Sequence, residues 1–152
     1  MLNDDMKNFL MYRLENRDEG FKTFAYDDKT GERVKAPEGN LTIGIGFNLD
    51  AGCPIALARV IAEWFINKND MLLSRCIKSY DDIDQFRQMV ISDMLYNLGY
   101  TKFAKFEKFI LAIENKDFVS ASREMLNSDW HRELPLRVES LALEMMSGKA
   151  AE

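Results

Sequence analysis

The period of the hydrophobic pattern changes at Gly20, and this change limits the folds open to the chain. Residues 3–18 carry apolar side chains three or four positions apart, which is typical of an amphipathic helix, and Gly20 is a natural helix stop. Residues 21–49 instead contain stretches in which apolar and polar side chains alternate. Two turn sequences, TG and PEGN, separate these stretches. We therefore expect a small antiparallel sheet of two or three strands, with strand candidates at 33–36 and 41–47.

The rest of the sequence predicts helices. Pro54 suits the first position of a long helical pattern, which could break at Asn67-Lys68-Asn69. Ser79-Tyr80-Asp81-Asp82 is expected to cap the next helix, and Gly99 to end it. The expected helices cover residues 54–79, 83–97, 102–114, 117–127 and 135–147.

These patterns predict an α+β fold in a single domain of 152 residues. We expect a sheet lobe at about 19–53, a connecting helix at about 54–79 and a helical lobe at about 80–148 that includes the N-terminal helix. Ligands tend to bind in the cleft between two such lobes.

The composition excludes several classes of function. No segment has the eighteen or so uninterrupted apolar residues of a membrane-spanning helix, so no membrane insertion is expected. A net charge of −5 argues against nucleic-acid binding, which depends on neutralising phosphates. Cys53 and Cys76 lie far apart and are expected to be free thiols, and His131 is the single histidine, so no metal or cofactor is expected.

Two acids and a threonine lie around the predicted sheet. Glu19 ends the first helix, Asp28 follows nine positions later, and Thr42 begins the stretch TIGIG. Two carboxylates across a gap suit glycoside hydrolysis, where one donates a proton to the leaving oxygen and the other stays ionised. From the residues alone, the alternative is that these acids are solvated helix and turn caps.

Several motifs resemble those of the phage-type lysozymes (endolysins), whose prototype is the T-even phage lysozyme. That family has a glutamate, eight residues, an aspartate, a turn, and a threonine that opens a TIGxG strand. Glu19, Asp28 and Thr42 match this spacing, whereas Asp27 does not. The segments Met94–Gly99 and 129–138 also resemble the family's helical lobe.

The resemblance implies a muramidase that cleaves the β-1,4 bond between N-acetylmuramic acid and N-acetylglucosamine with inversion. Glu19 would be the general acid, while Asp28 and Thr42 would activate and hold the attacking water. Arg137 would reach Glu19 from the helical lobe and orient it. The family's saccharide or peptide contacts correspond to Asn48, Tyr96, Phe109 and Glu124, although none keeps the prototype's residue type.

For Tyr96 and Phe109, a core position is an equal alternative, and Trp130 is expected in the core. The segment between Asp28 and Thr42 is longer than in the family, and Phe47 stands where the family usually has histidine. The acidic net charge also differs from the basic free endolysins, which weakens electrostatic attraction to an anionic cell wall.

The resemblance implies a role in phage-mediated host lysis or wall penetration, with peptidoglycan glycan strands as partner. We expect a monomer that stays in the host cytoplasm until a holin or a delivery partner releases it to the cell wall, because the N-terminus lacks the features of a signal peptide. Two alternatives stay open: a lysozyme-like binding module with weak or lost activity, and a muramidase toxin or effector.

Overall fold

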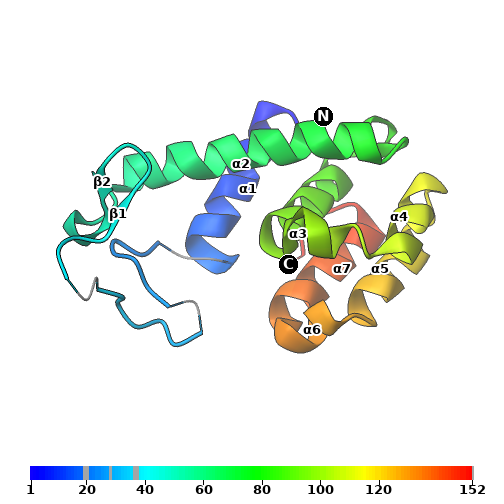
Figure 1. Cartoon of the computed structure of the whole chain (residues 1–152). Coiled ribbons are helices and arrows are strands. Elements are labelled where there is room, and N and C mark those ends of the chain that lie inside the picture. Colours follow the sequence, from blue (N-terminus) through cyan, green and yellow to red (C-terminus); the bar gives the residue numbers. More distant parts are fainter. Residues whose placement is uncertain (19–20, 28, 36–37, 152) are drawn as a thin grey trace. The chain divides into compact units, whose positions relative to one another are not determined.

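The computed structural model describes residues 1–18, 21–27, 29–35 and 38–151 (Figure 1). These residues are mostly helical and include one two-stranded antiparallel sheet, which is compatible with the α+β class that the sequence predicts. The helices are α1 (Asp4–Arg13), α2 (Ile55–Cys76), α3 (Gln85–Phe103), α4 (Glu107–Glu114), α5 (Phe118–Leu126), α6 (Asp129–Glu133) and α7 (Pro135–Ser147). The strands are β1 (Thr42–Ile43) and β2 (Phe47–Asn48).

The chain forms two compact units. Unit 1 contains Met1–Leu10 and Trp64–Glu152, and unit 2 contains Met11–Glu63. In unit 1, α7 packs against α3, α5 and α6, and α4 packs against α5. The predicted apolar faces of the helices at 83–97 and 135–147 are buried there, including Val90, Met94 and Leu141.

The start of the chain is anchored inside unit 1 by a buried carboxylate. Asp70 of α2 accepts hydrogen bonds from the Leu2 amide, at 3.1 Å to each oxygen, and from the Tyr80 hydroxyl at 2.9 Å. The Met1 ammonium binds Asp81, and the Asn3 amide donates to the Gln85 side chain at 2.6 Å. Leu2 is thereby buried, so the first residues complete the core of a unit that otherwise begins at Trp64.

Tyr80 makes this anchor sensitive to high pH. Its burial, together with the negative charge of Asp70, raises the pKa of the Tyr80 hydroxyl. The folded chain therefore keeps a proton that an unfolded tyrosine loses near pH 10, so the stabilisation is complete below about pH 10 and falls as the pH rises further. We expect Tyr80→Phe to lower the unfolding free energy by about 1.5–3 kcal/mol at neutral pH and to flatten its decline above pH 10.

Urea unfolding from pH 7 to 11 measures both effects. Tyr100→Phe, at an exposed tyrosine, controls for loss of a hydroxyl. Parallel alkaline declines in the wild type and Tyr80→Phe would contradict the assignment to Tyr80.

Two predicted helix boundaries differ in the structure. Ser79-Tyr80-Asp81-Asp82 does not cap the helix, because Tyr80–Asp82 forms a separate 3-10 turn and Asp84 is the cap, accepting a hydrogen bond from the Arg87 amide at 3.0 Å. Gly99 interrupts the helical backbone as expected, at φ 69° and ψ 160°, but α3 resumes and extends to Phe103.

Two other helices also differ from the sequence analysis. The long helix α2 does not break at Asn67-Lys68-Asn69, and the short helix α6 was not predicted.

Gly99 occupies a backbone conformation that essentially only glycine adopts. A Cβ at this position would meet no atom within 4 Å, so the cost of Gly99→Ala comes from the backbone alone. We expect this substitution to lower the unfolding free energy by about 1–3 kcal/mol. Urea denaturation measures the loss, with Thr101→Ala as the exposed control in the same helix; an unchanged midpoint for Gly99→Ala would show that the backbone there can relax.

Unit 2 contains less regular sheet than the sequence predicts. TIGIGF is a hairpin rather than one strand, because Gly44 and Gly46 take left-handed φ values of 61° and 74° and reverse the chain. The expected strand at 33–36 is reduced to a single bridge between Tyr26 and Arg33; Ala36 and Pro37 lie outside the described residues. The Arg33 guanidinium also stacks on Phe24, with its central carbon 3.7 Å from the ring centroid.

Candidate functional site

The two predicted catalytic carboxylates, Glu19 and Asp28, lie outside the described residues. The neighbouring Asp27 is described, and it is a turn residue: one carboxylate oxygen accepts hydrogen bonds from the amides of Lys29 and Thr30, at 2.8 and 3.1 Å. Asp27 therefore has a local structural role, in agreement with the family spacing that selects Asp28 instead.

The hairpin brings two predicted site residues together in unit 2. Thr42 and Asn48 are directly opposite each other in the β1–β2 pairing. Thr42 is exposed, and its hydroxyl donates to the Asn40 carbonyl at 3.3 Å. The Asn48 side chain instead accepts from the Asp50 amide at 2.9 Å and caps the following turn. Its oxygen is therefore engaged in local structure, which leaves Thr42 as the more available polar group.

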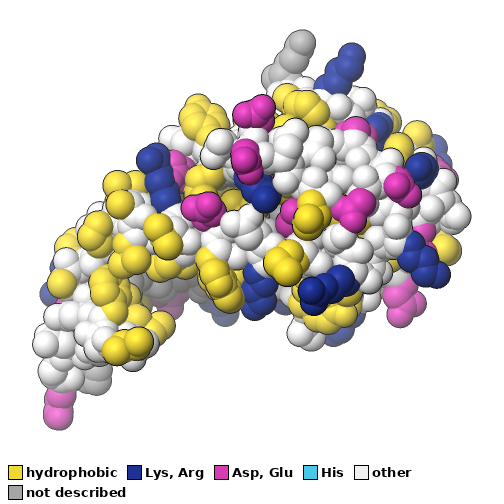
Figure 2. Space-filling model, turned by 90° about the horizontal axis from the view of Figure 1, so that it is seen from above, with side chains coloured by type: hydrophobic (Ala, Val, Ile, Leu, Met, Phe, Trp, Pro, Cys, Tyr) yellow, Lys and Arg dark blue, Asp and Glu magenta, His cyan; other side chains and the backbone are white. Residues whose placement is uncertain are grey.

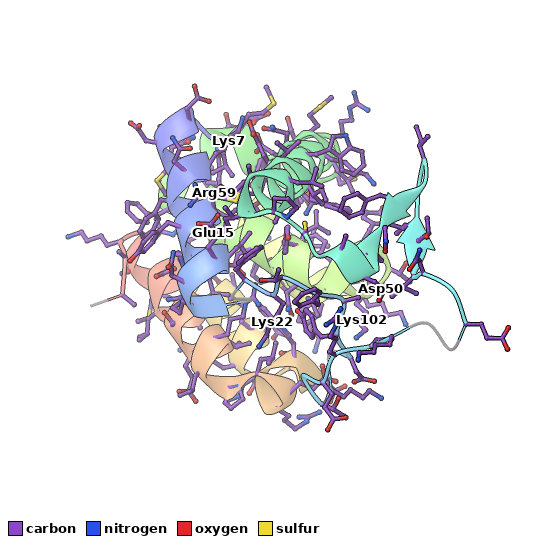
Figure 3. The ribbon with its side chains drawn as sticks, turned by 90° about the vertical axis from the view of Figure 1, so that its left-hand side faces the viewer. Lys7, Glu15, Lys22, Asp50, Arg59 and Lys102 are labelled. Carbon is purple, nitrogen blue, oxygen red and sulfur yellow. The ribbon has the colours of Figure 1, made fainter. Side chains whose placement is uncertain are left out.

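Four residues before Glu19, Glu15 forms an ion pair within unit 2. The Arg59 guanidinium of α2 donates two hydrogen bonds to the Glu15 carboxylate, at 2.5 and 2.9 Å, and the two side chains point toward one another in Figure 3. The hydrogen bond from Arg59 lowers the pKa of Glu15. The pair joins the π-helical segment Leu14–Asp18 to α2 and keeps Glu15 ionised, so this acid does not suit a proton-donating role.

Arg137 takes part in a buried ion pair within unit 1. Its Nε and Nη2 donate to Asp93 Oδ1 at 3.1 and 2.8 Å, and both residues are buried. The pair joins the start of α7 to the middle of α3. The predicted contact of Arg137 with Glu19 stays a prediction, since Glu19 is outside the described residues.

Removing one partner of this pair would leave the other charge in the core. We expect Arg137→Met to lower the unfolding free energy by about 3–5 kcal/mol, and Arg137→Met combined with Asp93→Leu to recover most of that loss. Arg132→Met is the control, because Arg132 pairs with Asp129 at the surface. Urea denaturation of the four proteins measures the differences; equal losses for Arg137→Met and Arg132→Met would contradict the expectation.

A pocket of 580 Å³ in unit 1 contains two more predicted residues, Phe109 and Glu124. Its lining also includes Trp130, whose indole donates to Asn97 at 2.7 Å. Charged side chains of both signs surround it: Lys102, Lys105, Lys108, Arg132, Glu107, Glu124, Asp129 and Glu133. Sequence analysis missed the lysines, although their spacing of three was visible in the first part of the predicted helix 102–114.

Phe109 and Trp130 are buried, which favours the core alternative for the first and agrees with the expectation for the second. The Phe109 ring packs edge-on against Phe103, with 6.4 Å between centroids. Of the two predicted contacts in this pocket, the half-buried Glu124 is therefore the more accessible. Tyr96 is not among the described residues that line this pocket. Its ring instead contacts the ring of Phe65, with 6.3 Å between the two centroids.

The described residues contain no cluster of three or more histidine, cysteine, aspartate or glutamate side chains that could hold a metal ion. None of the described helices is both long enough and apolar enough to cross a membrane. Cys53 and Cys76 are free cysteines.

Comparison with known proteins identifies two relatives from Dictyostelium discoideum. "Probable T4-type lysozyme 2" is 33% identical over 58 residues, which are 38% of this chain and 34% of that protein. "Probable T4-type lysozyme 1" is 27% identical over 128 residues, which are 84% of this chain and 71% of that protein. No protein-family model matches the chain.

The chain is distantly similar to proteins named T4-type lysozymes. This agrees with the resemblance seen in the sequence. The chain spans about a third of the length of the first relative, but most of the second. Both relatives come from Dictyostelium, so the expected phage setting stays a prediction.

Proposed function

We propose that this chain is a peptidoglycan-degrading muramidase that hydrolyses the β-1,4 bond between N-acetylmuramic acid and N-acetylglucosamine. The observation that carries the proposal is the set Glu19, Asp28 and Thr42 at the spacing of the phage-type lysozymes, in a chain similar to a T4-type lysozyme over 84% of its length. Glycoside hydrolysis needs two carboxylates in different protonation states, and Glu19 and Asp28 are the proposed pair.

Each residue has a distinct role in the proposed mechanism. Glu19 donates a proton to the leaving oxygen, while Asp28 deprotonates a water molecule on the opposite face of the sugar. The exposed Thr42 hydroxyl helps to hold that water. The configuration at the anomeric carbon is inverted, which requires a carboxylate separation of about 6.5–9.5 Å.

Arg137 would act on Glu19 in this mechanism. A nearby guanidinium lowers the pKa of a carboxylic acid, whereas a general acid needs a raised pKa. The bonds to Asp93 hold the guanidinium and moderate its positive charge, which favours orientation of Glu19 over strong acidification. Asn48, Tyr96, Phe109 and Glu124 are the proposed substrate contacts; Glu124 is favoured by its open pocket, and Phe109 is disfavoured by its burial.

We further propose that the chain acts as a monomer in phage-mediated lysis or wall penetration. Its net charge of −5 gives no electrostatic attraction to an anionic wall. Local release from the host cytoplasm, through a holin or a delivery partner, would bring the protein to the wall without electrostatic attraction.

Release of reducing ends from purified peptidoglycan tests the catalytic proposal. We expect Glu19→Gln and Asp28→Asn to lower the rate by about 10²–10⁴-fold, because each removes a proton-transfer group. Asp27→Asn is the matched control: it neutralises the adjacent acid but keeps an oxygen for the turn hydrogen bonds, and it should retain near wild-type activity.

The outcomes separate the proposal from its alternatives. A folded wild-type protein that binds glycan without releasing reducing ends would be the lysozyme-like binding module. Loss of activity in Asp27→Asn but not in Asp28→Asn would overturn the assignment of the base. Proton NMR of the first product formed would show the α-anomer for inversion, and the β-anomer would contradict that mechanism. A toxin or effector would share the chemistry but would require an immunity partner.

A further inference from the structure

An aromatic cluster with a lysine lies at the surface of unit 1, outside the pocket described above. Trp64 and Phe65 are adjacent in α2, with edge-to-face rings whose centroids are 4.9 Å apart. Trp64 is 57% exposed and Phe65 is 41% exposed. The Lys68 ammonium lies 4.9 Å from the Trp64 ring centroid and 5.9 Å from that of Phe65. The ring of Tyr96 in α3 makes a T-shaped contact with the ring of Phe65.

The helical spacing places polar groups beside the exposed indole. Asn67 and Lys68 are three and four positions after Trp64, so they share its face of α2. On this side the large exposed ring is bordered by an amide and an ammonium, whereas the exposed apolar side chains Val60 and Ile61 lie four and three positions before it. Figure 2 shows that hydrophobic side chains are open to solvent on the face it displays.

A sugar ring has the complementary chemistry. Its axial C–H groups form an apolar face that stacks on an aromatic ring, and its rim carries hydroxyl and acetamido groups that bind amides. An ammonium next to the stacking ring adds a preference for an anionic sugar. N-acetylmuramic acid carries a carboxylate on its lactyl group or, where it is substituted, on its peptide.

We propose that Trp64, with Phe65, Asn67 and Lys68, is a secondary binding site for carboxylate-bearing peptidoglycan glycan strands. This inference rests on the proposed function, since it takes the same polymer as its ligand. The sugar stacks on the Trp64 ring, Lys68 leaves the ring face and pairs with the carboxylate, and Asn67 binds the polar rim. Such a site would hold the chain on a long glycan strand.

The tryptophan content allows this site to be observed directly. The sequence contains two tryptophans, the exposed Trp64 and the buried Trp130, so Trp130→Phe leaves Trp64 as the single indole. Combined with Glu19→Gln, which prevents turnover, this variant is titrated with oligosaccharides of alternating N-acetylglucosamine and N-acetylmuramic acid. We expect a saturable change in emission, and a roughly five- to tenfold weaker apparent affinity after Lys68→Gln.

Oligomers of N-acetylglucosamine alone are the carboxylate-free comparison. They should bind more weakly, and Lys68→Gln should not weaken them further. In an otherwise wild-type chain, Trp64→Ala should raise KM on polymeric peptidoglycan roughly five- to tenfold while kcat is unchanged. Leu111→Ala, an exposed apolar residue of α4, is the matched control and should leave both parameters unchanged.

Each contrary result is decisive. If the wild type releases reducing ends but Trp64 emission does not respond to muramic acid oligosaccharides, the secondary site is wrong and the proposed function stands. If Trp64 responds and no reducing ends appear, the site stands and the enzyme proposal fails. An emission change with phosphatidylglycerol vesicles instead of glycan, or a dimer that Trp64→Ala dissociates in sedimentation velocity, would assign the cluster to a membrane or to a second copy and overturn the proposal.

Discussion

Burial of apolar side chains in unit 1 is the constraint on which the rest of the structure depends. Almost all of the buried apolar residues described belong to this unit, and Leu14 is the one that belongs to unit 2. Hydrophobic burial is the dominant stabilising contribution in folding. Unit 2 therefore relies on directional interactions: the Glu15–Arg59 pair, the stacking of Arg33 on Phe24, and the glycine-dependent hairpin. The proposed catalytic residue Thr42 belongs to this unit, whose geometry is consequently easier to alter.

The sequence was most informative where one physical effect dominates. The helices of unit 1 follow from their apolar periodicity, and Gly99 interrupts the backbone where expected because few other residues tolerate its dihedral angles. Prediction failed where local hydrogen bonding competes with periodicity. Alternating side chains suggested a strand at 33–36, but only one bridge forms, because no continuous partner strand is available among the described residues. TIGIG was predicted to lie in one strand at 41–47, but the left-handed backbones of Gly44 and Gly46 reverse the chain within it.

The residues of the candidate site also divide into those that a sequence pattern indicates and those whose roles depend on the fold. The resemblance to the phage-type lysozymes selects Glu19, Asp28 and Thr42 as the candidate catalytic set, and this set stays a prediction. The roles of supporting residues depend on tertiary contacts that no local pattern contains. Asn48 is engaged in a turn, Phe109 is buried, and Arg137 binds Asp93, which lies 44 positions earlier. The exposed Trp64 was likewise concealed within a helix that reads as apolar.

The discontinuous makeup of unit 1 has a consequence for biosynthesis. The Leu2 amide binds Asp70 and the Asn3 amide binds Gln85, so the first residues meet partners 68 and 82 positions later. Such contacts close long loops, which slows folding. On the ribosome, the amino-terminal segment must wait until α2 and the start of α3 have emerged, with its apolar residues unprotected in the meantime. The core around these residues can therefore form only after α2 and the start of α3 are available to them.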